Sequence, residues 1–187
     1  MDPCTDFLDD KAYLKHMIPH HQVAIDMSEL LMVKTSNPFM LHLCRDIIRK
    51  QGYEIWEMEL MMKSLPGEVF VESESQRETV DTKLSYYEPK MSLPEAGGCD
   101  PLFFDPEAHE KHMEHMPITD RSYLEHMIPH HQVAIDMSRR LLKHTKNSYL
   151  LDFCRKLIYD QQNEIFLMNN LLKENYEYKS TYLKTKA

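Results

Sequence analysis

Glycine is scarce in this sequence, with four in 187 residues. That shortage argues against the turn-rich chains of all-β proteins, and the many Leu, Met, Glu and Lys residues favour helix over sheet. No apolar run is long enough to cross a membrane. The sequence therefore predicts an all-α protein without a transmembrane segment.

Positive charge is also in short supply. Lys and Arg number 22 against 30 Asp and Glu, the net charge is -8, and no long basic run occurs. Because nucleic-acid-binding domains usually carry a basic face, we expect no nucleic-acid partner.

The N-terminus, MDPCTDFLDD, lacks the basic and apolar regions of a signal peptide, which predicts a cytoplasmic protein by default.

Cysteines are too few and too scattered for a disulfide scaffold, and no CxxC motif is present. Cys44 and Cys154 hold matching places in two repeats described below, and are interpreted as buried small side chains or soft ligands. A Cys4–Cys99 bridge stays open at this stage.

The strongest feature that is present is an internal repeat. Residues 13–28 read YLKHMIPHHQVAIDMS and residues 123–138 read YLEHMIPHHQVAIDMS, so that 15 of 16 positions match at an offset of 110. Beyond this block the two copies diverge, but a Cys, a Gln, a Glu and a Met recur at the same offset. Packing alone does not easily explain two adjacent histidines, a Gln and a Glu.

Each repeat is predicted to fold as two helices. In the first copy they span roughly 6–34, with Asp6 or a neighbour as the cap, and from Pro38 to about Ser64, capped by Ser36 or Asn37. In the second copy they span about 120–144 and 148–175, with Asn147 as the cap. Short connections make the helices of each copy antiparallel neighbours, and four helices enclose one core.

The predicted organisation is a four-helix bundle made from two duplicated hairpins, 1–65 and 119–175. Residues 66–118 are expected to be a long, mostly irregular crossover with a His/Met-rich end, tied to the bundle by Tyr86-Tyr87 and Phe103-Phe104. Residues 176–187 are expected to be a polar C-terminal tail.

Histidine and methionine side chains fall on the inner faces of these helices. At about 100° per residue, the histidines of the repeated block flank or enter the apolar side. Asp26 and Asp136 fall on the polar face, where a salt bridge or a ring-orienting bond is expected. In the second helix, Gln51 and Met58 share the apolar stripe and Glu54 lies at its edge. A buried carboxylate is costly unless it is paired or binds a metal.

These faces predict a metal site inside the hairpins. Imidazole suits copper, zinc, iron and nickel, whereas thioether sulfur selects Cu(I), so the mixture points to copper, with zinc or iron as alternatives. Gln51 and Glu54 are also candidates for orienting the imidazole rings. The predicted ligands are the His and Met of the repeated block with the Glu and Met of the second helix: His16, Met17, His20, His21, Met27, Glu54, Met58, His126, Met127, His130, His131, Met137, Glu164 and Met168.

A third cluster, HEKHMEHM at residues 109–116, precedes the second repeat and has no counterpart before the first. It is either a capture segment for a soft ion or an exposed helical turn without function.

The block HMIPHHQVAIDM, followed by Gln51-Gly-Tyr-Glu54-Ile-Trp-Glu-Met58 and its copy at 161–168, resembles the signature of domain-of-unknown-function family 305, in two tandem copies. The resemblance implies a ferritin-like bundle, and copper binding through the His and Met of these motifs. Some family members look like exported bacterial copper-binding proteins used in copper tolerance, and many carry an export signal.

Three functions are compatible with these patterns. The first is copper binding for buffering, storage or tolerance, with a metal-donor or acceptor protein as a partner and no enzymatic activity, because no nucleophile or acid–base pair is evident. The second is a ferritin-like di-metal oxidase, although the predicted helices lack the Glu-x-x-His that such sites use. The third is a structural or interaction module whose histidines form hydrogen bonds.

Overall fold

The protein is built from helices alone in the part of the chain that the computed structural model describes, residues 2–65 and 99–177. The four long helices are α1 (Asp10–Met32), α2 (Pro38–Ser64), α5 (Asp120–Leu142) and α6 (Ser148–Leu172). The shorter elements are a 3-10 helix η3 (Pro101–Phe104), α4 (Pro106–Met113) and a π-helical turn η4 (Lys173–Glu177). The predicted all-α bundle is confirmed. Tyr86-Tyr87 and most of the polar tail lie outside the described residues.

Local capping explains where the long helices begin. The side chain of Asn37 accepts a hydrogen bond from the Phe39 amide ahead of Pro38, and Asn147 caps α6 in the same way. The cap expected at Asp6 or a neighbour is Asp9, and α1 begins at Asp10, later than predicted. Asp6 is not free to cap, because its carboxylate accepts from the backbone amide of Asp2.

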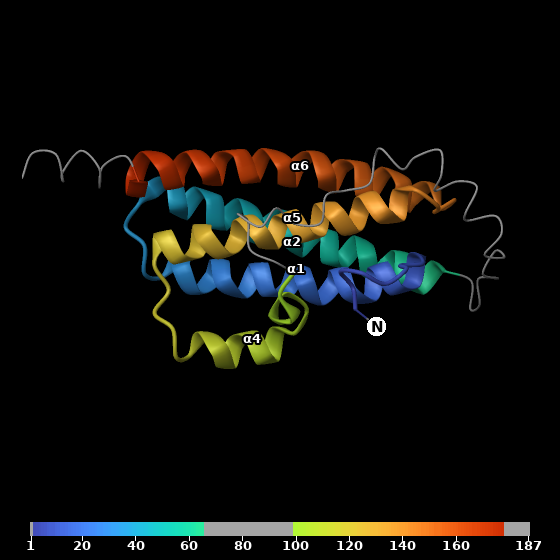
Figure 1. Cartoon of the computed structure of the whole chain (residues 1–187), viewed down its shortest axis with the longest axis horizontal. Coiled ribbons are helices and arrows are strands. Elements are labelled where there is room, and N and C mark those ends of the chain that lie inside the picture. The colour runs from blue at the N-terminus through green and yellow to red at the C-terminus, as the bar shows by residue number, and fades with distance from the viewer. Residues whose placement is uncertain (1, 66–98, 178–187) are drawn as a thin grey trace, which may run out of the picture.

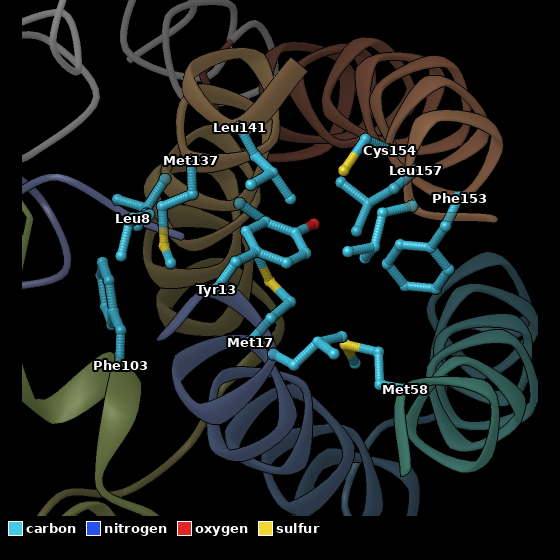
Figure 2. Close-up of a cluster of buried hydrophobic side chains, with 14 residues drawn as sticks. Leu8, Tyr13, Met17, Met58, Phe103, Met137, Leu141, Phe153, Cys154 and Leu157 are labelled. Carbon is cyan, nitrogen blue, oxygen red and sulfur yellow. The ribbon is translucent and has the colours of Figure 1, made fainter. Parts of the chain in front are cut away.

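The two hairpins, α1–α2 and α5–α6, are joined mainly through α1 and α5, which run antiparallel (Figure 1). Each of two apolar clusters mixes both repeats. One combines the first half of α1 with the second half of α5 and the first half of α6, and Figure 2 shows Tyr13 and Met17 reaching into it beside Met137 and Leu141. The other cluster has the inverse composition. The duplicated sequence therefore folds as one body with a pseudo-twofold arrangement.

The described end of the crossover is more ordered than predicted. Asp105 caps α4, with Pro106 at its first position, and Phe103 of η3 is buried against the bundle. The bridge that the sequence left open is present, between Cys4 and Cys99, with Cα atoms 6.3 Å apart. Both cysteines pack against the same apolar cluster as Phe103. In the described residues, no helix combines the length and apolar character that a membrane span requires.

Candidate metal centre

The middle of the bundle holds two stacked imidazoles, one from each repeat. His20 of α1 and His130 of α5 are fully buried, and their ring centroids are 3.6 Å apart. Neither nitrogen of either ring makes a hydrogen bond of ordinary geometry. Burial, followed by the neighbouring histidines, holds both pKa values well below the usual 6.5. Both rings are therefore neutral at pH 7, with lone pairs available to a metal ion.

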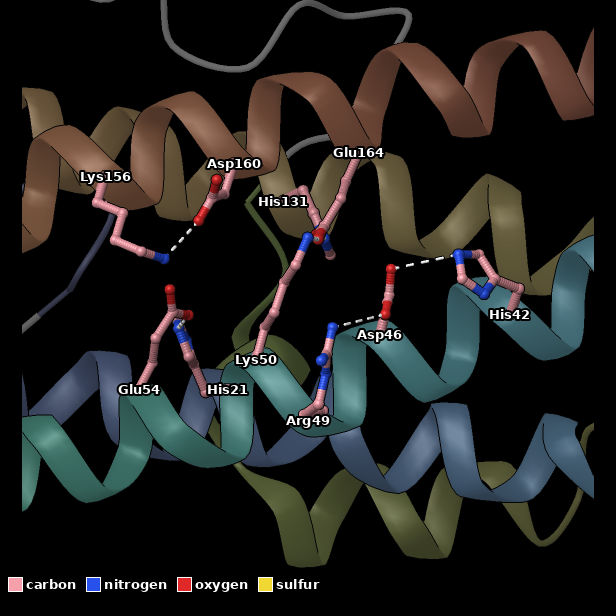
Figure 3. Close-up of polar contacts among 10 residues, drawn as sticks. All are labelled: His21, His42, Asp46, Arg49, Lys50, Glu54, His131, Lys156, Asp160 and Glu164. Atoms are coloured by element: carbon pink, nitrogen blue, oxygen red, sulfur yellow. Dashed lines mark hydrogen bonds and ion pairs between the residues drawn. The ribbon is translucent and has the colours of Figure 1, made fainter.

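Each stacked histidine is followed by a second one that is tied to a carboxylate (Figure 3). Nε2 of His21 lies 2.9 Å from Oε2 of Glu54, and Nε2 of His131 lies 2.7 Å from Oε2 of Glu164. The Nδ1 atoms of both rings are buried without a partner. A carboxylate on one nitrogen is the arrangement that orients a metal-binding imidazole, leaving the other nitrogen for the ion. The two glutamates thus lie where a ring-orienting role requires.

The two carboxylates differ in their surroundings, although the repeats match. Lys50 of α2 reaches across the bundle to Oε1 of Glu164, at 3.0 Å. Burial by itself raises the pKa of Glu164, but His131 and Lys50 outweigh burial and lower it. The counterpart of Lys50 in the second repeat is Asp160, which is paired with Lys156 at 2.6 Å. The repeats therefore differ in charge around otherwise equivalent His–Glu pairs.

The amides of Gln51 and Gln161 add further unpartnered atoms. Both side chains are buried, and neither their nitrogen nor their oxygen atoms have a hydrogen-bond partner. Each lies three residues before the glutamate that holds a histidine, and so on the same side of its helix. Of the two residue types predicted to orient the rings, the glutamates form that contact. The glutamine amides remain without hydrogen bonds, although buried polar groups are normally hydrogen-bonded.

The buried thioethers are shared between the repeats. Met17 and Met58 of the first repeat pack in one cluster with Met137 of the second. The other cluster holds Met127 and Met168 of the second repeat with Met27 of the first. The predicted methionines are therefore all in the interior, with one of each set supplied by the opposite hairpin.

The remaining predicted ligands, His16 and His126, lie toward the edge of the bundle and are partly buried. Phe104 meets His16 edge to face, with ring centroids 6.1 Å apart. His126 faces Phe103, at 5.0 Å, and His109 of α4, at 5.2 Å. Burial lowers the pKa of His126 to about 4. Phe103 also meets both central imidazoles edge to face, so that η3 covers the stacked pair.

Two features of the site depart from the sequence-based expectations. Asp136, expected on the polar face, is nearly buried and accepts a hydrogen bond from Gln132. His109 was assigned only to the HEKHMEHM cluster, yet it is buried beside a predicted ligand. The one signal for His109 in the sequence was that this His/Met cluster has no counterpart before the first repeat.

Nitrogen and oxygen ligands alone do not complete a site in the described part of the chain. Within residues 2–65 and 99–177, no three His, Cys, Asp or Glu side chains converge closely enough to hold a metal ion. The interior also holds the thioethers of the two apolar clusters, and thioether sulfur favours a soft ion.

Comparisons with known proteins place this arrangement in a family. The family model described as "Domain of unknown function (DUF305)" matches residues 10–172. Over 66 residues the chain is 44% identical to an uncharacterized protein of Acanthamoeba polyphaga mimivirus, a match that spans 34% of this chain and 43% of that protein. The chain thus spans less than half the length of this relative.

Solved structures with the same fold include CopM in an Ag-bound form, at 26% identity and a TM-score of 0.62, covering 91% of this chain and 99% of that one. CopM in its Cu(I)-bound form has 25% identity and a TM-score of 0.62, covering 90% and 99%. A DUF305 fragment from Deinococcus radiodurans has 22% identity and a TM-score of 0.58, covering 87% and 94%. The chain belongs to the DUF305 family.

Proposed function

We propose that this DUF305 protein binds copper as cargo, through His and Met side chains in the interior of its bundle, and buffers, stores or carries the ion. The observation that carries the proposal is the set of buried imidazole nitrogens without hydrogen bonds of ordinary geometry on His20, His21, His130 and His131. Leaving a buried polar atom unpaired costs about 1–3 kcal/mol. Such a cost at six ring nitrogens is understandable if an ion is their partner.

The choice of copper rests on the mixture of donors. Neutral imidazole accepts several transition metals, but thioether sulfur is soft and favours Cu(I). Buried Met17, Met58 and Met137 pack in one cluster, and Met27, Met127 and Met168 in the other. The similar CopM structures include Cu(I)-bound and Cu(II)-bound forms, which supports the same cargo here.

The arrangement gives less support to a di-metal oxidase. Such sites use Glu side chains from two helices together with Glu-x-x-His from two others. Here each buried glutamate is already engaged by a histidine, and Glu164 also by Lys50. We propose that the protein carries its ion without catalysing a reaction.

The Cys4–Cys99 disulfide bears on where the protein works. Structural disulfides persist in oxidising compartments and are rare in a reducing cytosol. We therefore favour an oxidising setting over the cytoplasmic default that the N-terminal sequence suggested.

The test is an anaerobic Cu(I) titration, with ascorbate as the reductant, of the wild-type protein and of the variant His20→Ala/His21→Ala/His130→Ala/His131→Ala. We expect the wild-type protein to take up copper stoichiometrically and the variant to lose the ions that these four histidines hold. Because the site-bound form is stabilised, copper should also raise the Tm of the wild-type protein more than that of the variant. Equal uptake by both proteins would contradict the proposal.

Two further variants separate loss of ligands from loss of fold. Met58→Leu/Met168→Leu removes two thioethers at nearly constant volume, which buried sites usually tolerate, and should weaken Cu(I) binding while the circular dichroism spectrum is unchanged. His42→Ala removes a histidine that is exposed on α2 and should leave binding unaltered. If the leucine variant bound Cu(I) as tightly as the wild type, the thioethers would have no role as ligands.

A further inference from the structure

His109 is a buried histidine that no repeat accounts for. It projects from α4, in the segment between the two repeats, and its side chain is 1% exposed. Its ring lies 5.2 Å from that of His126, centroid to centroid, with an interplanar angle of 60°. The Nε2 atoms of both rings are buried and have no hydrogen-bond partner. Two neighbouring imidazoles, each with a buried unsatisfied nitrogen, need a further partner.

Among the residues that the structure describes, the first repeat has no such pair at the equivalent place. His16 is the counterpart of His126, and it faces the ring of Phe104. The insert therefore contributes aromatic rings to both repeats and adds an imidazole to the second. The duplication cannot have produced His109 as a packing relic, because the segment has no second copy.

We propose that His109 and His126 form an additional copper site at the boundary between α4 and α5. The site is distinct from the central histidines and does not depend on copper binding there. Two metal–nitrogen bonds of about 2.0–2.1 Å that meet at a bent angle bring the centroids of two imidazoles to within roughly 5–6 Å, which accommodates the observed separation. A bent pair of imidazoles leaves room for a third ligand, which solvent or a delivering ligand can supply.

Two carboxylates near the pair favour a positive charge, against the larger opposing effects of burial and of neighbouring histidines. Burial is the largest influence on His109 and His126 and holds both rings in the neutral, metal-binding form. The carboxylate of Asp100 exerts a favourable electrostatic effect on a positive charge at either ring, and that of Asp26 does so at His109. His112, on the same short helix, is exposed to solvent. The pair therefore lies close to the surface but out of water.

The pair also stands at the outer end of a row of rings that reaches the centre of the bundle. The His126 and His130 centroids are 6.3 Å apart, and His130 stacks on His20. His126, which would hold the ion together with His109, is thus the direct neighbour of the central pair.

The test counts bound Cu(I) by native mass spectrometry under anaerobic conditions. His109→Phe keeps a ring in the buried position and removes the nitrogens, and we expect it to bind one ion fewer than the wild type. His112→Ala, on the exposed side of the same helix, is the matched control and should bind as many ions as the wild type. Equal counts for the wild type and His109→Phe would overturn the inference.

Two additions make the result independent of folding and of the central site. In the wild-type protein, Cu(I) should shift the ¹⁵N resonances of the His109 and His126 imidazoles, and unshifted resonances would overturn the inference even if His109→Phe failed to fold. The quadruple variant that lacks His20, His21, His130 and His131 should retain one ion, which His109→Phe should then remove. If that variant bound as many ions as the wild type, while His109→Phe still lost one, the central proposal would fail and this site would stand.

Discussion

The hydroxyl of Tyr13, in the first repeat, lies 2.7 Å from Oγ of Ser138, in the second. Ser138 donates its own proton to the carbonyl of Ala134, so Tyr13 is the donor in this bond. The inverse pair is present too, with Tyr123 2.8 Å from Ser28, which donates to Ala24. These two bonds join the hairpins across otherwise apolar clusters. Each copy of the repeated block therefore supplies the tyrosine of one bond and the serine of the other.

Tyr13→Phe should destabilise the protein by about 1–2 kcal/mol, because one buried hydrogen bond is lost and the ring is kept. Tyr123→Phe should cost a similar amount, and the two effects should add, since the bonds lie in separate clusters. Urea unfolding monitored by circular dichroism measures both. Tyr53→Phe, at an exposed position of α2, is the control and should change the free energy of unfolding little. If the Tyr13→Phe protein were as stable as this control, the Tyr13–Ser138 bond would contribute nothing to the free energy of unfolding.

Glu54→Gln should lower the affinity for Cu(I) roughly 10- to 100-fold, as other changes to the groups that orient metal-binding histidines do. The carboxylate holds Nε2 of His21, and a neutral amide holds this ring less firmly. Competition with a chromogenic Cu(I) chelator gives the affinity. Glu59→Gln makes the same change of charge at an exposed position of the same helix and should bind like the wild type. Matching affinities for both variants would show that Glu54 does not act through His21.

The free energy of unfolding should fall as the pH is lowered from about 6.5 toward 4. Burial depresses the pKa of His20, His130 and His109, and brings that of His126 to about 4. In the unfolded chain these groups have ordinary values near 6.5, so the unfolded state binds more protons throughout this range. The contribution of these groups to the free energy of unfolding is therefore fully present above the unfolded pKa and is lost as the pH falls. For His126 alone, the loss is on the order of 1–3 kcal/mol.

Urea unfolding of the metal-free protein at pH 7.5 and pH 5 measures this dependence. The variant His126→Gln should show a smaller loss between the two pH values, whereas His42→Ala, at an exposed position, should show the wild-type loss. Equal stability of the wild-type protein at both pH values would contradict the buried neutral state of these rings.

Loss of the disulfide should lower the Tm without removing the helical bundle. The bridge joins cysteines 95 residues apart, and closing a loop of this length is expected to stabilise the fold by about 2–5 kcal/mol. Cys4→Ser/Cys99→Ser, compared with the wild type by thermal unfolding, tests this. Reduction of the wild type should reproduce the shift and leave the double variant unaffected. An unchanged Tm on reduction would show that the bridge is not formed in solution.

Much of the secondary structure could be predicted because its causes are local. Asn37 and Asn147 are strong caps that precede a helix start, and both predicted starts are confirmed. The start of α1 was misplaced because two acidic residues near it, Asp6 and Asp9, are equally good caps by type. Only the turn that engages Asp6 with Asp2 decides between them.

The burial of the site residues could be predicted in the same way, but their partners could not. Helical periodicity places His20 and His21 on the inner side of α1, whichever helix lies opposite. That His20 meets the same residue of the other repeat, His130, follows from the antiparallel crossing of α1 and α5. No periodicity within one helix contains that information.

By itself, the sequence determined a duplicated pair of helices with imidazole, thioether and carboxylate groups turned inward, because helix formation, capping and the facing of side chains depend on near neighbours along the chain. Only the tertiary structure decided that the two hairpins exchange methionines, that Lys50 approaches one glutamate of the two, and that α4 sets His109 beside His126. These contacts join residues far apart in the chain, and they are chosen by how whole helices pack.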